Sequence, residues 1–286
     1  MKRWLAALII LALAAGGAYW KREPLVMGWL ASKVEHSDLA AREALLKDYL
    51  EIVTPEGDGP FPIVMLLHGC AGVRPPFLHQ WADVSAQAGY AAVIVDSNNP
   101  RGFHRNDGLD IVCKGKALLG QERAGDIVAV FNLLKDDPRL DLSRLVVAGW
   151  SHGAWTTLDF LTMDGKTKKP AGLDVSGAEW PRIEAAIFVY PYCGVGVLTR
   201  FRALTQRPKM LALIAGDDEI VEEELCIDYF GRLKKSGGDV EVTVYPDANH
   251  VFDDPYLAPE DLRLYNAADH ADATARVSAF LRGLSD

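Results

Sequence analysis

Short apolar runs that alternate with helical periodicities constrain the fold of this chain more than any other feature. Six runs are rich in β-branched residues and almost continuously apolar, which is typical of parallel strands buried on both faces of a sheet. They are residues 62–69, 91–96, 144–149, 185–190, 209–216 and 240–245. Helical periodicities occupy residues 77–88, 117–135, 152–162, 222–236 and 260–283. This alternation predicts one α/β domain with a mostly parallel central sheet, helices on both of its faces and a ligand site at the carboxyl ends of the strands.

Two further segments flank this pattern. Residues 49–53, Tyr-Leu-Glu-Ile-Val, come before the first buried run, and we expect them to form an antiparallel edge strand. Residues 162–182 have no periodicity and contain turn-forming residues, so we expect a surface excursion there.

The first 20 residues differ from the rest of the chain. Two cations precede an apolar run from Trp4 to Ala18, a length that suits a secretory signal peptide better than a full membrane span. An uncleaved membrane anchor is the alternative, and the positive charges on both sides leave its orientation open. We expect a signal peptide or anchor over residues 1–20, a lead-in segment over 21–47 and the folded domain over 48–286. The protein is then exported, either periplasmic or secreted, or tethered to the membrane.

The charge of the chain limits its partners. With 30 basic and 39 acidic residues, the formal net charge is −9. The sequence has no basic stripe, which argues against nucleic acid as a partner.

One buried run ends in an unusual sequence, Gly149-Trp150-Ser151-His152-Gly153. It resembles the nucleophile elbow, Gly-x-Ser-x-Gly, in which a sharp turn from strand to helix exposes the serine hydroxyl. Glycine is needed on either side because the turn leaves no room for a Cβ. Ser151 lies between a predicted strand and a predicted helix, which is the context that the motif requires, so we expect it to be a nucleophile.

A serine nucleophile needs a base and an acid that orients the base. In α/β-hydrolases these follow the serine in the order acid, then histidine. Only His250 and His270 remain after Ser151 and its neighbour His152. His270 falls within a helical pattern, whereas His250 lies in a loop five residues past the last predicted strand. We therefore expect His250 to be the base.

The acid should lie between Ser151 and His250 in the chain, at the carboxyl end of a predicted strand. Asp217 and Asp218 follow the run that ends at Gly216. Many α/β-hydrolases carry Gly-x-x-Asp-x-x-Val here, and this chain is one residue short of that pattern. Counting back from Val221 selects Asp218, whereas counting forward from Gly216 selects Glu219. We favour Asp218, with Asp217 as the alternative.

The transition state also needs donors for an oxyanion. We expect the backbone N–H of His152, at the positive end of its helix, and the backbone N–H of Cys70, in the loop after an earlier strand. We expect the side chain of His68 to be structural, since it precedes the serine and has no acid of its own.

These motifs together resemble the dienelactone hydrolase family of α/β-hydrolases. The matching pieces are His68-Gly69-Cys70, residues 89–102, the Ser151 elbow, residues 190–194, 215–221 and 245–253. The resemblance implies a single-domain hydrolase of esters or lactones, without a metal or other cofactor. Dienelactone hydrolases proper use a cysteine nucleophile, however, and the serine at position 151 puts the dienelactone substrate in doubt.

Three residues are candidates for contact with the substrate: Arg101, Trp155 and Tyr192. Arg101 could hold a carboxylate, although a surface pair with Asp107 or Asp110 is an equal alternative. We favour core packing over a pocket wall for Trp155. A second charged pair, Arg123 with Asp126, is expected on the surface of a helix.

The chain has four cysteines, which allow three disulfide connectivities. Cys70 and Cys113 follow neighbouring strands, and Cys193 and Cys226 lie beyond the ends of two others. Loops on adjacent strands lie side by side, so we expect the disulfides Cys70–Cys113 and Cys193–Cys226, provided that the protein is exported. No two cysteines show the close spacing of a zinc site.

The sequence therefore predicts a serine hydrolase that cleaves a carboxylic ester or lactone through Ser151, Asp218 and His250. A peptidase or an acyltransferase on the same triad, and a non-catalytic binding module on the same fold, are the alternatives. The oligomeric state is left open.

Overall fold

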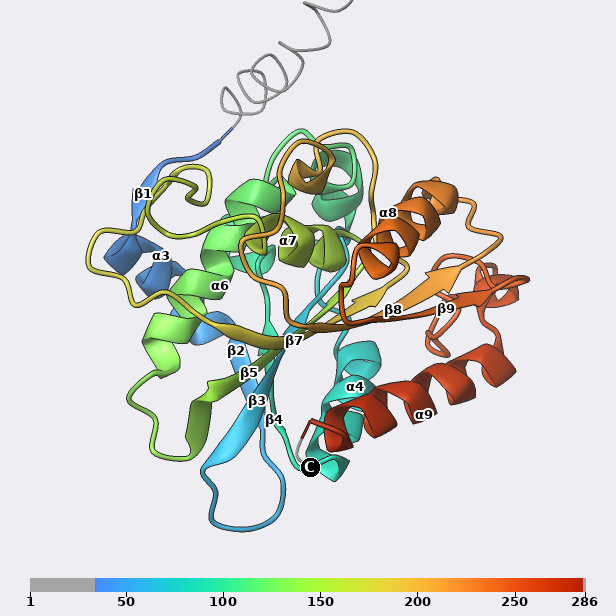
Figure 1. Cartoon of the computed structure of the whole chain (residues 1–286), viewed down its shortest axis with the longest axis horizontal. Coiled ribbons are helices and arrows are strands. Elements are labelled where there is room, and N and C mark those ends of the chain that lie inside the picture. Colours follow the sequence, from blue (N-terminus) through green and yellow to red (C-terminus); the bar gives the residue numbers. More distant parts are fainter. Residues whose placement is uncertain (1–33, 285–286) are drawn as a thin grey trace, which may run out of the picture.

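A seven-stranded sheet runs through the middle of the molecule (Figure 1). The computed structural model describes residues 34–284, so the expected signal peptide or anchor lies outside the described residues. The strand order is β2-β4-β3-β5-β7-β8-β9, and every neighbouring pair is parallel except β2 with β4. The strands are β2 (Leu50–Val53), β3 (Phe61–Leu67), β4 (Ala91–Val95), β5 (Leu140–Trp150), β7 (Ile183–Val189), β8 (Lys209–Ala215) and β9 (Val240–Tyr245). The six predicted parallel strands and the antiparallel edge strand are confirmed, with ends that differ by a few residues.

Helices cover both faces of this sheet, as the sequence predicts (Figure 1). One face carries α3 (Leu39–Leu46), α6 (Gly120–Leu134), α7 (His152–Phe160) and α8 (Glu223–Lys235). The other face carries α4 (Pro75–Gln87) and α9 (Ala267–Arg282). Shorter helical segments are α5 (Arg105–Asp107) and single turns at Lys47–Tyr49, Asn99–Arg101, Gly108–Val112, Leu198–Arg200 and Leu262–Leu264. Among residues 34–284, no helix is long and apolar enough to cross a membrane.

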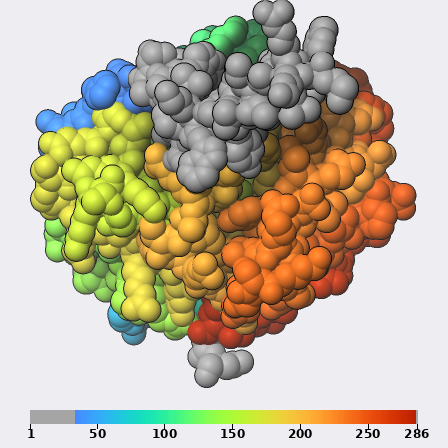
Figure 2. Space-filling view, turned by 45° about the horizontal axis from the view of Figure 1, so that its top comes forward, coloured from blue at the N-terminus to red at the C-terminus, as the bar shows by residue number. Residues whose placement is uncertain are grey.

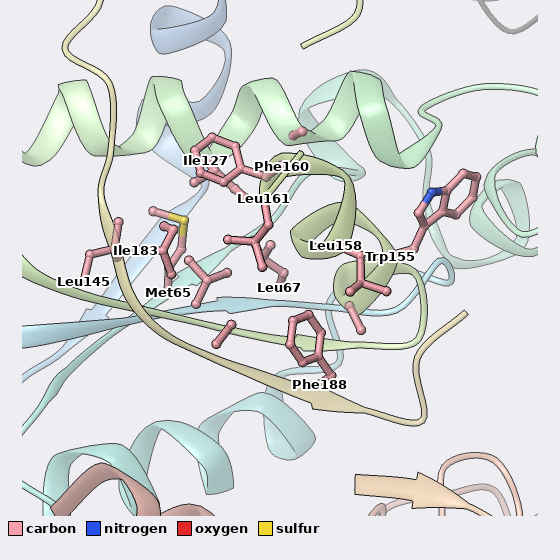
Figure 3. Close-up of a cluster of buried hydrophobic side chains, with 14 of the residues drawn as sticks. Met65, Leu67, Ile127, Leu145, Trp155, Leu158, Phe160, Leu161, Ile183 and Phe188 are labelled. Atoms are coloured by element: carbon pink, nitrogen blue, oxygen red, sulfur yellow. The ribbon is translucent and has the colours of Figure 1, made fainter. Parts of the chain in front are cut away.

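The core has two layers because successive side chains of a strand point to opposite faces. In β3, Met65 and Leu67 belong to the layer under α6 and α7, whereas Val64 and Leu66 pack toward α4 and α9. Figure 3 shows the first layer, in which Phe188 of β7 lies below the helical side chains. Continuous burial on both faces explains why the inner strands are mostly apolar rather than alternating.

The last helix begins later than the periodicity predicts. Its N-cap is Asn266, whose side chain accepts hydrogen bonds from the backbone N–H groups of Ala268 and Asp269. An asparagine in this position satisfies N–H groups that have no partner within the helix. The cap therefore sets the start of α9 at Ala267 rather than near residue 260.

The described part of the expected lead-in segment packs on the domain. Leu46 of α3 is fully buried in the core, and Arg42 is buried against α6. Just before α3, β1 (Ser37–Asp38) pairs with β6 (Leu173–Asp174), a short strand within residues 162–182. Figure 2 shows this excursion, in yellow-green, at the surface beside the blue residues of α3.

Candidate active site

Ser151 lies at the turn between β5 and α7, in the centre of the sheet. Its backbone has φ 51° and ψ −110°, a conformation that a residue with a Cβ rarely adopts. The two glycines of the motif are sterically required. A Cβ on Gly149 would lie 2.4 Å from the carbonyl carbon of Gly153, and one on Gly153 would lie 2.1 Å from the carbonyl oxygen of Leu67. The turn thus has the geometry that the nucleophile-elbow motif predicts.

His250 and Asp218 form a short hydrogen-bonded pair, and like Ser151 they lie at the carboxyl ends of the parallel strands. Nδ1 of His250 lies 2.6 Å from Oδ2 of Asp218, and both side chains are more than 90% buried. Oδ1 of Asp218 accepts from the backbone N–H groups of Ile220 and Val221. These bonds fix the carboxylate, and its position makes Nδ1 the donor nitrogen of the imidazole.

The structure distinguishes the other acids of this loop from Asp218. Asp217 has an exposed side chain, and its backbone N–H donates to the carbonyl oxygen of Ala248. Glu219 is also exposed and pairs with Arg263. Of the three neighbouring acids, only Asp218 therefore contacts His250 in the described structure.

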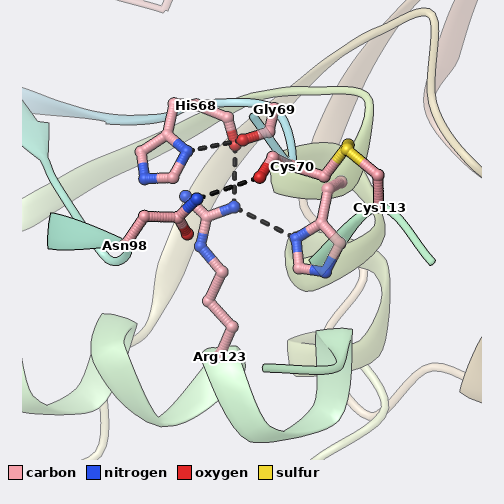
Figure 4. The surroundings of a disulfide bond; sticks show 7 residues. His68, Gly69, Cys70, Asn98, Cys113 and Arg123 are labelled. Atoms are coloured by element: carbon pink, nitrogen blue, oxygen red, sulfur yellow. Dashed lines mark hydrogen bonds between the residues drawn. A yellow bond between two sulfur atoms is a disulfide. The ribbon is translucent and has the colours of Figure 1, made fainter. Parts of the chain in front are cut away.

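The two segments expected to bind an oxyanion lie beside Ser151. A Cβ on Gly69 would be 3.7 Å from Cβ of Ser151, which places the loop after β3 against the serine. The carbonyl of Cys70 accepts a hydrogen bond from Asn98 Nδ2 at 2.9 Å (Figure 4). On the other side, His152 is the first residue of α7, so its N–H is among those that the helix leaves unpaired.

Both predicted disulfides are present in the structure. Cys70 is bonded to Cys113 (Figure 4), and Cys193 is bonded to Cys226. The first cross-links the loop after β3 to the segment after β4. The second cross-links the loop after β7 to α8. Both cross-links therefore brace loops at the carboxyl ends of the strands, where Ser151 also lies.

The two expected surface pairs, of Arg123 with Asp126 and of Arg101 with Asp107 or Asp110, are wrong. Arg123 and Asp126 do not form a pair on a helix surface, because both side chains are fully buried. Asp126 pairs instead with Arg42 at 2.8 Å and with Arg101 at 2.7 Å. Burial would raise the pKa of Asp126, but Arg101 and Arg42 outweigh burial and lower the pKa to about 2. The guanidinium of Arg101 is thereby occupied, and neither Asp107 nor Asp110 is its partner.

Arg123 holds the loops around the site from below. Its Nη1 donates to the carbonyl oxygen of His68 at 2.7 Å and lies 3.1 Å from Nδ1 of His152 (Figure 4). Its Nε donates to Oγ of Ser97. Burial lowers the pKa of Arg123 to about 10, so the side chain still carries its charge at neutral pH.

The two histidines of these loops are buried and neutral. Nδ1 of His68 bonds to the carbonyl oxygen of Gly69, and its Nε2 accepts from the backbone N–H of Ser97. Burial, followed by the charge of Arg123, lowers the pKa of His68 and of His152. Because both nitrogens of His68 have partners, the geometry agrees with a structural role for that ring.

The aromatic candidates for substrate contact lie together. The rings of Trp155 and Tyr192 are 5.2 Å apart, and Trp155 also contacts His152 at 5.0 Å. Trp155 is 6% exposed and donates from Nε1 to Asp159, so it is mainly a packing residue. Tyr192 is half-buried, and its hydroxyl donates to the carbonyl oxygen of Val195.

Sequence reasoning missed Tyr190 and Asp253. The ring of Tyr190 lies 4.6 Å from that of His250, and its hydroxyl donates to the buried carboxylate of Asp253. An aromatic residue at the end of a predicted strand is a weak signal for such a contact, and no local pattern points to Asp253. Among residues 34–284, no cluster of three His, Cys, Asp or Glu side chains could hold a metal ion.

A model of the dienelactone hydrolase family matches residues 50–285. The chain belongs to the dienelactone hydrolase family. The resemblance predicted from the motifs is therefore confirmed, and with it the α/β-hydrolase fold.

Solved structures of similar fold include a protein described as a putative dienelactone hydrolase and one described as an esterase. A putative dienelactone hydrolase from Klebsiella pneumoniae has a TM-score of 0.58 and 20% identity, over 81% of this chain and 91% of the other. An esterase from Thermogutta terrifontis has a TM-score of 0.55 and 15% identity, over 80% and 86%. At these identities the similarity establishes the fold alone.

Several dipeptidyl-aminopeptidases are similar in sequence to this member of the dienelactone hydrolase family. A probable dipeptidyl-aminopeptidase B of Grosmannia clavigera is 26% identical over 178 residues, which are 58% of this chain and 18% of that protein. One from Ajellomyces capsulatus is 25% identical over 205 residues, 66% and 22%. The chain spans about a fifth of the length of these relatives.

Proposed function

We propose that this protein is a serine hydrolase that cleaves a carboxylic ester or lactone. The observation that carries the proposal is the hydrogen-bonded pair of His250 and Asp218 at the same sheet edge as the strained turn of Ser151. This arrangement provides a nucleophile, a base and an orienting acid in the order expected for the fold.

In the proposed mechanism, Oγ of Ser151 attacks the carbonyl carbon while Nε2 of His250 takes its proton. Asp218 holds the imidazole in the required tautomer and stabilises its positive charge. The N–H groups of Cys70 and His152 bind the oxyanion. His250 then returns the proton to the leaving alcohol, and a water molecule hydrolyses the resulting acyl-enzyme in a second, similar step.

The buried charges near the site favour an uncharged substrate. Arg101 was the candidate partner for a substrate carboxylate, but its guanidinium is bonded to Asp126 and to the carbonyl oxygen of Ser97. To bind a substrate carboxylate, Arg101 would have to give up its bonds to the buried Asp126, which would then keep only Arg42 as a charged partner, and weakening a buried ion pair in this way is costly. We therefore propose a neutral ester or lactone, with Trp155 and Tyr192 as candidates for apolar contact.

A peptidase is the second candidate, because dipeptidyl-aminopeptidases are among the relatives of this chain. The same triad can cleave an amide. The match covers only about a fifth of those proteins, however. It therefore does not include the rest of their length. Parallel assays with aryl esters and dipeptide anilides separate the two functions.

We also propose that the protein is exported, as a periplasmic or secreted enzyme or one tethered by its N-terminus. The two disulfides support this, because such bonds persist in oxidising compartments.

The decisive experiment is labelling with a fluorophosphonate, which reacts with activated serines. The wild-type protein should be labelled, and Ser151→Ala should lose both labelling and ester hydrolysis. Ser176→Ala, which changes an exposed serine of the surface excursion, is the control and should react like the wild type. Labelling that persists in Ser151→Ala would contradict the assignment of the nucleophile.

A further inference from the structure

Another buried carboxylate, that of Asp253, lies three residues beyond His250 and is completely enclosed. Its Oδ1 accepts a hydrogen bond from the hydroxyl of Tyr190 at 2.8 Å, and its Oδ2 accepts one from Nε1 of Trp150 at 2.9 Å. A buried carboxylate without partners would be strongly destabilising, so both bonds have structural weight. The proposed mechanism gives Asp253 no role.

Both partners of Asp253 are immediate neighbours of the proposed catalytic side chains. Trp150 is the last residue of β5 and directly precedes Ser151. Tyr190 follows β7 with a φ of 34°, and its ring lies against the imidazole of His250. Asp253 itself belongs to the loop that carries His250. One carboxylate therefore connects the nucleophile turn, the ring beside the base and the loop of the base.

The loop around Asp253 is fixed from outside as well. Nε2 of Gln80, in α4, donates to the backbone carbonyl of Asp253 at 3.1 Å. The carbonyl of Phe252 accepts from the backbone N–H of Asn266, which caps α9. These two hydrogen bonds fix the backbone on either side of the carboxylate. The carboxylate can therefore hold the side chains of Tyr190 and Trp150 in fixed positions through its own hydrogen bonds.

We infer that Asp253 is a positioning residue that keeps His250 in register with Ser151, through Tyr190 on one side and Trp150 on the other. The inference rests on the proposed function, because that function makes His250 the base and Ser151 the nucleophile. In the described structure the carboxylate of Asp253 is bonded to Tyr190 and Trp150 and not to the imidazole of His250, so it acts through its two neighbours.

The donor chemistry of the two neighbours makes this role testable with graded substitutions. The indole N–H of Trp150 can only donate, whereas the hydroxyl of Tyr190 can donate or accept. In Asp253→Asn the amide oxygen can face Trp150 and the amide N–H₂ can face Tyr190, so both contacts persist with one reversed. Asp253→Ala removes both contacts.

The first measurement is steady-state ester hydrolysis by the full-length protein. In Asp253→Ala, kcat should fall by roughly 100-fold with KM nearly unchanged, since misplacing a base by about 1 Å has an effect of this size. Asp253→Asn should recover most of that loss. Tyr190→Phe keeps the ring but loses the hydroxyl, and it should have an intermediate kcat.

Asp254→Asn is the matched control. Asp254 is the next residue, is equally buried and pairs with Arg74 and the backbone N–H of Tyr256. Its substitution removes a neighbouring charge but neither bond of Asp253. Its kcat should stay close to the wild-type value.

The second measurement is NMR of the His250 imidazole, which needs no substrate. The ring resonances of His250 should move in Asp253→Ala and Tyr190→Phe but not in Asp254→Asn. Should fluorophosphonate fail to label the wild type while these resonances still move, the proposed function would be wrong and the positioning role would stand. Folded variants with unchanged kcat and unchanged His250 resonances would overturn the inference. If Asp253→Ala does not fold, Asp253→Asn and Tyr190→Phe carry the same test.

Discussion

At the residue scale, Asp217 and Asp218 are neighbours in the chain with opposite surroundings. Asp218 is buried, bonded to His250 and held by two backbone N–H groups, whereas Asp217 points its side chain into solvent. A carboxylate that is fixed beside an imidazole sets its tautomer, whereas a solvated carboxylate does not. The two residues should therefore differ sharply in their contribution to turnover.

We expect Asp218→Asn to lower kcat by about 10³–10⁴-fold, because the imidazole loses its orienting and charge-compensating partner. Asp217→Asn should change kcat by less than about threefold, since an exposed charge acts weakly through solvent. Pre-steady-state and steady-state assays with a chromogenic ester measure both. A larger loss in Asp217→Asn would show that the loop rearranges in solution.

The sequence is least informative about which side chains contact each other. The partner of Asp126 is Arg42, 84 residues earlier, and the partner of Asp253 is Trp150, 103 residues earlier. Local spacing makes Arg123 and Asp126 look like an exposed helical pair, because it contains no information about what packs over α6. The pairing of His250 with Asp218 could be predicted because a motif and the ends of strands restrict the positions of both residues.

At the scale of elements, the loop after β3 depends on a cross-link as well as on hydrogen bonds. Cys70–Cys113 closes a loop of 43 residues and fixes the segment whose N–H is a proposed oxyanion donor. Cys193–Cys226 closes one of 33 residues and braces α8 instead. The two bonds should stabilise the fold similarly but differ in their effect on turnover.

Replacing Cys70 and Cys113 by alanine should lower the free energy of unfolding by roughly 2–4 kcal/mol, mainly because the unfolded chain gains freedom. It should also reduce kcat about tenfold or more, as a proposed donor moves. The matched double variant of Cys193 and Cys226 should lose similar stability but keep more of its kcat. Denaturant titration and ester hydrolysis test this, and equal kcat values in the two variants would count against a role of the first bond in the site.

Elements were predicted well where one physical signal dominates. The inner parallel strands are buried on both faces, so their sequences are mostly apolar and easy to recognise. The start of α9 was misplaced because the periodicity extends beyond the cap at Asn266. The helix Leu39–Leu46 was missed because it is short and its burial depends on contacts with α6.

At the scale of the whole molecule, Asp253 links the site to the pH dependence of stability. Burial raises the pKa of Asp253 to about 7 from an ordinary value of 3.8. Between these two pH values the folded protein binds this proton more tightly than the unfolded chain does. The contribution of Asp253 to the free energy of unfolding therefore falls as the pH rises from about 4 to about 7 and levels off above that.

We expect the free energy of unfolding of the wild type, relative to Asp253→Asn, to decrease over this pH interval. Asparagine does not titrate, and both proteins share all other titratable groups. The difference between their free energies of unfolding therefore reports the titration of Asp253. Urea denaturation at a series of pH values between 4 and 8 provides the measurement. Parallel curves for the two proteins would mean that Asp253 does not titrate in this range.

The backbone of Ser151 bears on whether this fold is maintained for catalysis. Its left-handed conformation destabilises the folded state by about 1–3 kcal/mol, and glycine at the same position would escape most of that penalty. A chain used only as a binding scaffold could therefore drift to glycine there and become more stable, with no loss to its task. Under the proposed function, serine at this strained position exchanges some folding stability for a nucleophile, an exchange that a binding scaffold would not need to make.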